Sequence, residues 1–116
     1  MTILRFETGP RMSQAVVYNG TVYLAGQVAS SAPGGTVRDQ TVAILAQIDA
    51  LLAAAGTSKS RLLSATIWLT DVSKFSEMNS VWDAWVSPGN TPARACVESK
   101  LVAPDYLVEI AVICAL

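Results

Sequence analysis

Two strand-like runs that are apolar on both faces occupy the last quarter of the chain, within residues 90–101 and 105–116. A strand with two apolar faces has to be covered on both sides of its sheet. The rest of the chain offers two amphipathic helical segments, and two helices cover one face of a sheet. We therefore expect the second cover to come from other copies of the same sheet, in a homo-oligomer.

The composition supports this expectation. Apolar residues make up 52% of the 116 residues and charged residues only 15%. A domain of this size has little interior relative to its surface, so surplus apolar residues have to lie on an exposed face or at an interface. The length indicates one domain over residues 1–116.

Charge and segment patterns exclude several classes of protein. The net charge is −1 and no basic run is present, so nothing indicates a nucleic-acid partner. Residues 1–7 lack the basic start and apolar run of a signal peptide, and no apolar stretch is long enough to span a membrane. Cys96 and Cys114 lie inside strand patterns and do not resemble a secreted disulfide framework. We expect a cytoplasmic protein without a membrane partner.

The chain contains no histidine. This excludes Ser–His and Cys–His nucleophile pairs and histidine-based metal sites. Two cysteines are too few for a cysteine-only zinc site, so we predict no metal. Any catalysis has to use carboxylates, arginine, backbone groups, tyrosine, cysteine or bound water.

The first half of the chain predicts strands followed by a long helix. Asn19-Gly20 is a strong hairpin signal between two strand patterns. Thr36 is a candidate N-cap, apolar residues follow at helical spacing, and Gly56 is a natural stop. The predicted strands are Ile3–Glu7, Gln14–Tyr18 and Thr21–Val28.

The second half predicts a strand, a helix and the two final strands. Leu62–Leu69 is rich in β-forming residues. Ser73 is the expected N-cap of the second helix, which Pro88-Gly89 ends. The apolar stripe of that helix consists of Phe75, Met78, Trp82 and Trp85. The element order predicts an α+β fold with a mixed sheet and both helices on one face.

Each final strand carries one charge, Arg94 in the first and Glu109 in the second. If these strands pair through their short connection, both side chains could share one face. Arginine grips a carboxylate through two parallel hydrogen bonds, and a partly buried glutamate with a raised pKa can act as general acid or base. An interfacial ion pair without chemistry is an equally weighted alternative.

Other candidate residues have ordinary structural interpretations. Asn79 borders the apolar stripe and, taken alone, is a solvated helix residue. Cys96 and Cys114 are small core residues by default. Gly26 indicates a β-bulge or, less favoured, a close backbone approach.

Four segments in register resemble the RidA/YjgF family of reactive-intermediate deaminases, within a divergent YoaB-like branch. They are Leu24-Ala-Gly-Gln27, Asn79 in Met-Asn-Ser-Val-Trp, Pro92-Ala-Arg-Ala-Cys-Val-Glu98 and Val108-Glu-Ile110. The resemblance implies a chorismate-mutase-like fold with a mixed six-stranded sheet, two helices on one face, and a homotrimer with pockets between subunits.

The resemblance also implies a reaction and its residues. Arg94 would bind the carboxylate of a small 2-imino or 2-enamino acid, and Glu109 would position or activate the hydrolytic water. Cys96 and Gly26 would offer backbone contacts, and Asn79 would help to build the pocket. The products would be a 2-oxo acid and ammonia, as for a 2-iminobutanoate or 2-iminopropanoate deaminase, without metal or organic cofactor.

Two departures keep alternatives open. Met12 stands where such deaminases carry a tyrosine, and Ala25 where they carry a serine or threonine, so the predicted pocket loses two hydroxyl groups. A non-catalytic protein that binds or senses a small carboxylate such as a 2-oxo acid is therefore the alternative. RNA cleavage is a third possibility, which the acidic charge balance and missing histidine disfavour.

Overall fold

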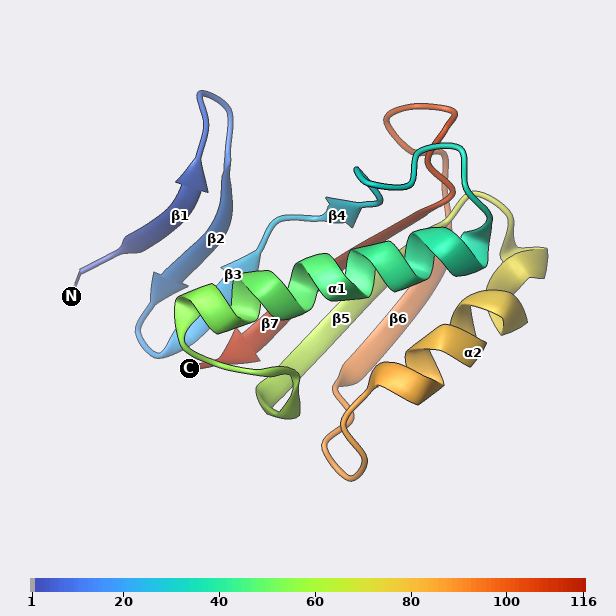
Figure 1. The fold of residues 1–116 in the computed structure, drawn as a ribbon. Helices are drawn as coiled ribbons and strands as arrows, with labels where there is room; N and C mark the ends of the chain where they lie inside the picture. The colour runs from blue at the N-terminus through green and yellow to red at the C-terminus, as the bar shows by residue number, and fades with distance from the viewer. Residues whose placement is uncertain (1) are drawn as a thin grey trace.

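In the computed structural model, which describes residues 2–116, a seven-stranded sheet carries two helices on one face (Figure 1). The elements in chain order are β1 (Leu4–Thr8), β2 (Ser13–Tyr18), β3 (Thr21–Leu24), β4 (Gln27–Val28), α1 (Val37–Ala55), β5 (Leu62–Leu69), α2 (Phe75–Trp85), β6 (Ala93–Glu98) and β7 (Val108–Ala115).

The strand order is β1-β2-β3-β7-β5-β6, and the short β4 also pairs with β7. Among the described strands, only β5 and β6 pair in parallel; the other neighbours are antiparallel. The predicted α+β fold, with a mixed sheet and two helices on one face, is confirmed. The sheet has one strand more than expected because the predicted strand Thr21–Val28 is divided into β3 and β4.

The division between β3 and β4 is a one-residue irregularity against β7. Tyr23 faces Ile113 and Gln27 faces Ile110, so four steps along one side (27 − 23) match three along β7 (113 − 110). One extra residue opposite a regular strand is a β-bulge, which the sequence pattern around Gly26 indicated. Among the described residues, Ala25 and Gly26 have no register partner on β7.

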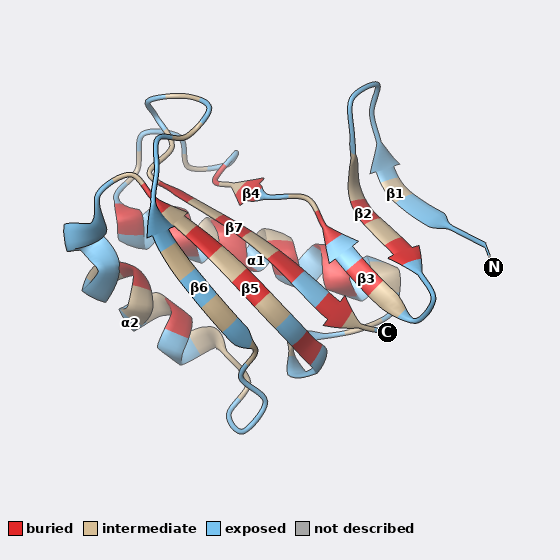
Figure 2. Cartoon of the chain, turned by 180° about the vertical axis from the view of Figure 1, so that it is seen from behind, coloured by how far each residue is buried: buried red, intermediate tan, exposed pale blue. Residues whose placement is uncertain are grey.

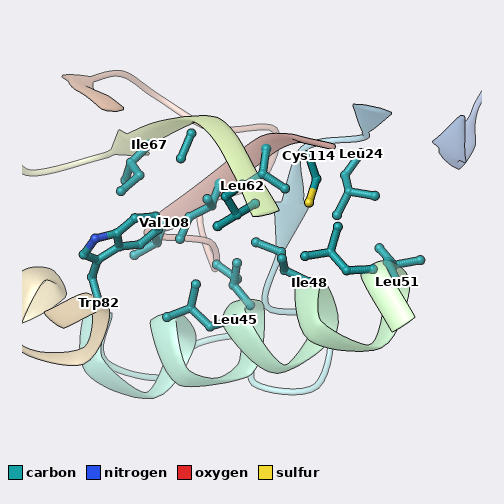
Figure 3. Packing of buried hydrophobic residues seen from close by; sticks show 14 of the residues in the cluster. Leu24, Leu45, Ile48, Leu51, Leu62, Ile67, Trp82, Val108 and Cys114 are labelled. Carbon is teal, nitrogen blue, oxygen red and sulfur yellow. The ribbon is translucent and has the colours of Figure 1, made fainter. Parts of the chain in front are cut away.

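Helix α1 begins and ends where its sequence signals predict. The Thr36 hydroxyl accepts a hydrogen bond from the Asp39 amide at 3.1 Å, and Gly56 adopts a left-handed conformation with φ 93°. A glycine at this position avoids the steric cost that a side chain would carry. The buried stripe of α1 packs on the sheet face formed by alternate residues of β3, β5 and β7 (Figure 3). Buried members of this core include Ile44, Leu45, Ile48, Leu52, Val22, Ile67, Ile110 and Val112.

The start of α2 differs from the prediction. Asp71, and not Ser73, accepts the capping hydrogen bonds, from the Ser73 amide at 2.9 Å and the Ser73 hydroxyl at 2.7 Å. These bonds begin a short 3₁₀ turn, Val72–Lys74, which continues directly into α2. The helix ends at Trp85, three residues before Pro88, because Val86 already has an extended conformation.

The two final strands, β6 and β7, are not neighbours. Strand β5 lies between them, since the β5–α2–β6 connection is a crossover that places β6 parallel to β5. The segment after β6 then passes the end of β5, where the Ser99 amide donates to the Leu69 carbonyl at 2.9 Å and the Thr70 amide to the Leu107 carbonyl at 3.1 Å. The prediction that these strands pair through their connection is therefore wrong.

Among residues 2–116, no helix covers the second face of the sheet (Figure 2). Exposed residues there include Tyr23 and Ile113, which alternate with buried residues of their strands, and Val97 of β6, a strand whose residues are exposed or partly buried. This arrangement agrees with the two-sided apolar strands of the sequence. Within residues 2–116, none of the helices combines the length and apolar character needed to cross a bilayer.

Gln40 connects the first turn of α1 to the segment before β7. Its side chain is 0% exposed; Nε2 donates to the carbonyls of Gly35 at 3.0 Å and Asp105 at 2.9 Å, and Oε1 accepts from the Leu107 amide at 2.8 Å. This side chain bonds three backbone groups outside the strands and helices, and of these the Asp105 carbonyl also accepts from the Gly34 amide at 3.1 Å.

We expect Gln40→Met to destabilise the fold by about 2 kcal/mol or more, because the Gly35 carbonyl and the Leu107 amide would lose their partner. Removing the cap with Thr36→Ala is the comparison and should cost only about 1 kcal/mol. Urea denaturation measures both variants. Similar losses for the two variants would contradict the role given to Gln40.

Candidate functional site

Arg94 lies on the helix-covered face of the sheet, beneath α2. In the sheet register Arg94 is beside Ala65, which in turn is beside Val112, and both neighbours are buried under the helices. The guanidinium donates from Nη1 to Asn79 Oδ1 at 2.8 Å. Its central carbon lies 5.2 Å from the ring centroid of Trp82 and 5.7 Å from that of Phe75. Arg94 is thus held by an amide and by two aromatic rings.

These partners are uncharged, so they orient the guanidinium without neutralising it. The bond to Asn79 uses one of the five N–H donors of the group, and aromatic faces favour a nearby cation. Arg94 is only partly buried. An arginine held in this way can bind an anion such as a carboxylate. Asn79, interpreted alone as a solvated residue, is instead a direct partner of Arg94.

Cys96 lies on the same face of β6 as Arg94 and packs against the core. Burial raises the pKa of its thiol, and the charge of Arg94 only partly offsets that effect. The thiol is therefore mainly protonated at neutral pH, which makes Cys96 a poor nucleophile.

Glu109 lies on the opposite, open face. Its register partner on β5 is Trp68, three residues from Ala65, and residues three apart on a strand point to opposite faces. Burial raises the pKa of the Glu109 carboxyl. Its carboxyl group packs on the backbone of Gly26, where an added Cβ would overlap Oε2 and lie 3.0 Å from Cδ. Gly26 therefore combines a bulge with a close approach.

The expected sharing of one face by Arg94 and Glu109 is wrong for a single chain. Strand β5 separates β6 from β7, which places the two backbones about 10 Å apart across the sheet and about 10 Å apart along it. The side chains also point to opposite faces. An ion pair between them within one chain is therefore excluded.

A cavity of about 510 Å³ lies beside Gly26, between the β1–β2 hairpin, β4 and α1. Met12 and Gly26 line it, together with polar side chains that include Glu7, Gln14, Gln27 and Gln47. Ala25 is next to the cavity; its amide donates to the Gln14 carbonyl at 2.9 Å, and its carbonyl accepts from Gln27 Nε2 at 3.1 Å.

The predicted site residues thus form two groups. Arg94, Asn79 and Cys96 lie together beneath α2, whereas Glu109, Gly26, Met12 and Ala25 gather around β4. Among residues 2–116, no group of His, Cys, Asp or Glu side chains could hold a metal ion.

Sequence reasoning missed two features of these groups. Trp82, 5% exposed, was assigned to the apolar stripe of the helix, with core packing as the favoured role, yet it also supports the guanidinium of Arg94. Its position three residues after Asn79, on the same side of a helix, could have indicated this. The glutamines around the cavity gave no periodic signal, although Gln27 directly follows Gly26.

Comparison with known proteins gives the same family as the sequence motifs. The model of the family described as Endoribonuclease L-PSP matches residues 2–116. The chain belongs to this family. Within it, the RutC family protein YoaB of Escherichia coli strain K12 is 42% identical over 115 residues, covering 99% of both chains. A RutC family protein of Haemophilus ducreyi is 40% identical over 114 residues, covering 98% of this chain and 97% of the relative.

A crystal structure from the same family has nearly the same fold. NMB1025 of Neisseria meningitidis, a member of the YjgF protein family, superimposes with a TM-score of 0.95 at 47% identity, covering 99% of this chain and 95% of its own. The predicted resemblance to the RidA/YjgF family, and to YoaB within it, is confirmed.

The raised pKa of Glu109 has a consequence for stability. The folded state binds a proton at this carboxyl more tightly than the unfolded chain does, so stability is lost as the pH rises from the ordinary glutamate pKa of 4.5 through the raised value. We expect Glu109→Gln to melt at a higher temperature than the wild type at neutral pH, with a difference that shrinks toward pH 4.5.

Melting temperatures of the two proteins over this pH range test the expectation. The same difference at every pH would show that the substitution acts through packing, and not through the titration of Glu109.

Proposed function

We propose that this protein is a hydrolytic deaminase of small 2-imino and 2-enamino acids, which it converts to 2-oxo acids and ammonia. The observation that carries the proposal is Arg94, a partly exposed cation that is held by Asn79 and Trp82 and has no acidic partner among residues 2–116. Such a group suits a substrate carboxylate, and the family motifs around it agree with the assignment.

The reaction needs a proton acceptor that can also return the proton. Water adds through its oxygen to the C2 carbon of the N-protonated imine while Glu109 accepts one of its protons, which gives a neutral carbinolamine. Glu109 returns this proton to the nitrogen, the C–N bond breaks, ammonia leaves, and the hydroxyl proton passes to Glu109 as the 2-oxo acid forms. An enamine first takes a proton at C3. A carboxyl whose pKa is raised toward neutrality by burial suits both directions of transfer.

Assembly brings the two groups of site residues together in this proposal. One small acid is too short to reach Arg94 and Glu109 of a single chain, because the two lie on opposite faces and two strands apart. A second copy can supply the missing group, with the β6–α2 edge of one chain against the Gly26 region of the next. The open apolar face supports such packing, and we propose a homotrimer with sites between subunits.

The proposal includes a location in the cytoplasm. Cys96 and Cys114 are both free thiols, which suits a reducing compartment. RNA cleavage, which the family description names, is disfavoured, because the described residues place no lysine or arginine along the cavity beside Gly26 and the net charge is −1.

Binding of a small carboxylate without turnover is the second candidate function. Met12 supports it, because this side chain faces the cavity and cannot donate a hydrogen bond to a substrate or a water. The guanidinium of Arg94 would bind the carboxylate equally well in a sensor of 2-oxo acids. Turnover separates the two functions.

We expect Arg94→Ala to lower kcat/KM for enzymatically generated 2-imino acids by at least about a hundredfold, because a charge-assisted contact to the carboxylate is lost. Release of 2-oxo acid or ammonia measures the rate, and Arg5→Ala, an exposed arginine on β1, is the control. Wild-type rates equal to the uncatalysed rate, across several amino-acid precursors, would contradict the deaminase. Thermal stabilisation by 2-oxo acids in that case would favour the sensor.

Mixing variants tests the position of the site between subunits. Arg94→Ala and Glu109→Gln should each be inactive alone, whereas refolding them together should restore activity at roughly one interface in four, since only those interfaces combine both intact residues. A mixture as inactive as its components would contradict a shared site.

A further inference from the structure

Three glutamines from three different elements form a continuous chain of hydrogen bonds beside Gly26. Gln47 of α1 donates from Nε2 to Gln27 Oε1 at 3.1 Å, and Gln27 of β4 donates from Nε2 to Gln14 Oε1 at 2.9 Å. Ser30 begins the chain by donating its hydroxyl to Gln47 Oε1 at 3.3 Å. The chain therefore runs from Ser30 to Gln14 on β2.

Backbone carbonyls fix the direction of this chain. Gln47 Nε2 also donates to the Val28 carbonyl at 2.9 Å, and Gln27 Nε2 also donates to the Ala25 carbonyl at 3.1 Å. A carbonyl oxygen can only accept, so the atom that faces it in each glutamine has to be the amide nitrogen. It follows that Gln27 can offer only a donor to Gln14, and that Gln14 has to present its oxygen to Gln27.

The Nε2 group of Gln14 is therefore the last donor in this series of hydrogen bonds. Within residues 2–116 it donates no hydrogen bond, and Gln14 lines the cavity together with Met12 and Gly26. The other polar side chains there are committed or cannot donate: both N–H groups of Gln27 and Gln47 are used, Ser30 donates to Gln47, and Glu7 as a carboxylate only accepts.

The hydrogen bonds between the glutamines also fix this donor in position before a ligand binds. Gln27 is only 5% exposed and is bonded on both sides, so Gln14 is held through one of its two polar atoms. Successive hydrogen bonds in one direction polarise each other, which strengthens the last donor. A donor that is fixed in position before binding loses less conformational entropy when a ligand arrives.

We propose that Gln14 Nε2 donates a hydrogen bond to the heteroatom at C2 of the ligand, the nitrogen of a 2-imino acid or the oxygen of a 2-oxo acid. Arg94 binds the carboxylate of any of these acids equally well. Gln14 then determines specificity, since it distinguishes 2-imino and 2-oxo acids from carboxylic acids that have no heteroatom at C2. The inference rests on the proposed function, because it places the C2 end of that ligand in the cavity beside Gly26.

Two ligands that differ at a single position test this contact. 2-Oxobutanoate and butanoate share the carboxylate and the carbon chain, and only the first has an acceptor at C2. We expect wild-type protein, as it assembles in solution, to bind 2-oxobutanoate about tenfold more tightly in calorimetry. Gln14→Met should reduce this preference to about twofold or less while butanoate affinity stays nearly unchanged, and Arg94→Ala should weaken both ligands alike.

A second variant is the control for loss of structure in Gln14→Met. Gln14→Glu keeps an oxygen for Gln27 Nε2 but removes the donor. Its negative charge weakens both carboxylates, so the ratio of the two affinities is the measurement, and this ratio should fall as in Gln14→Met. A preference that persists in either folded variant, or an equal loss of both ligands in Gln14→Met, would overturn the role of Gln14 alone. Wild-type protein that binds neither acid would overturn the proposed function and this inference together.

Discussion

Strand β7 is the element on which the rest of the molecule depends. It pairs with β3 and β4 on one side and with β5 on the other, so it joins the N-terminal hairpin to the βαβ half of the fold. Its alternating side chains send Val108, Ile110 and Val112 into the core and Glu109 to the open face. A shift of one residue would exchange the two sets and bury the carboxylate. The apolar set thereby fixes the position of Glu109.

The sequence allowed accurate prediction where local chemistry decides the structure. The cap at Thr36, the left-handed Gly56 and the apolar spacing between them depend on nearby residues, so α1 was predicted to the residue. The neighbours of β6 and β7 could not be predicted in the same way. Their alternation gives the faces of each strand but not the strand beside it, and the crossover through α2 placed β5 between them.

The candidate site also combines residues that could be predicted from the sequence with contacts that could not. Family motifs identified Arg94, Asn79, Gly26 and Glu109, but residue spacing alone paired the two charges wrongly, because the error in strand order placed them on one face. The contacts of the glutamines span 13 to 20 residues and link three elements, so no local pattern could reveal them. Such contacts exist only after the hairpin, the bulge and α1 have packed together.

The uncharged surroundings of Arg94 link assembly to ligand concentration. In one chain the guanidinium reaches water as well as Asn79, so its charge is solvated. In the assembly that we propose, part of this water is displaced by a second copy, and a cation moved from water without an anion carries a free-energy cost. A bound carboxylate removes that cost at the moment when it arises. The ligand is then a component of the interface, and by linkage a rise in its concentration favours the assembled form as strongly as assembly favours its binding.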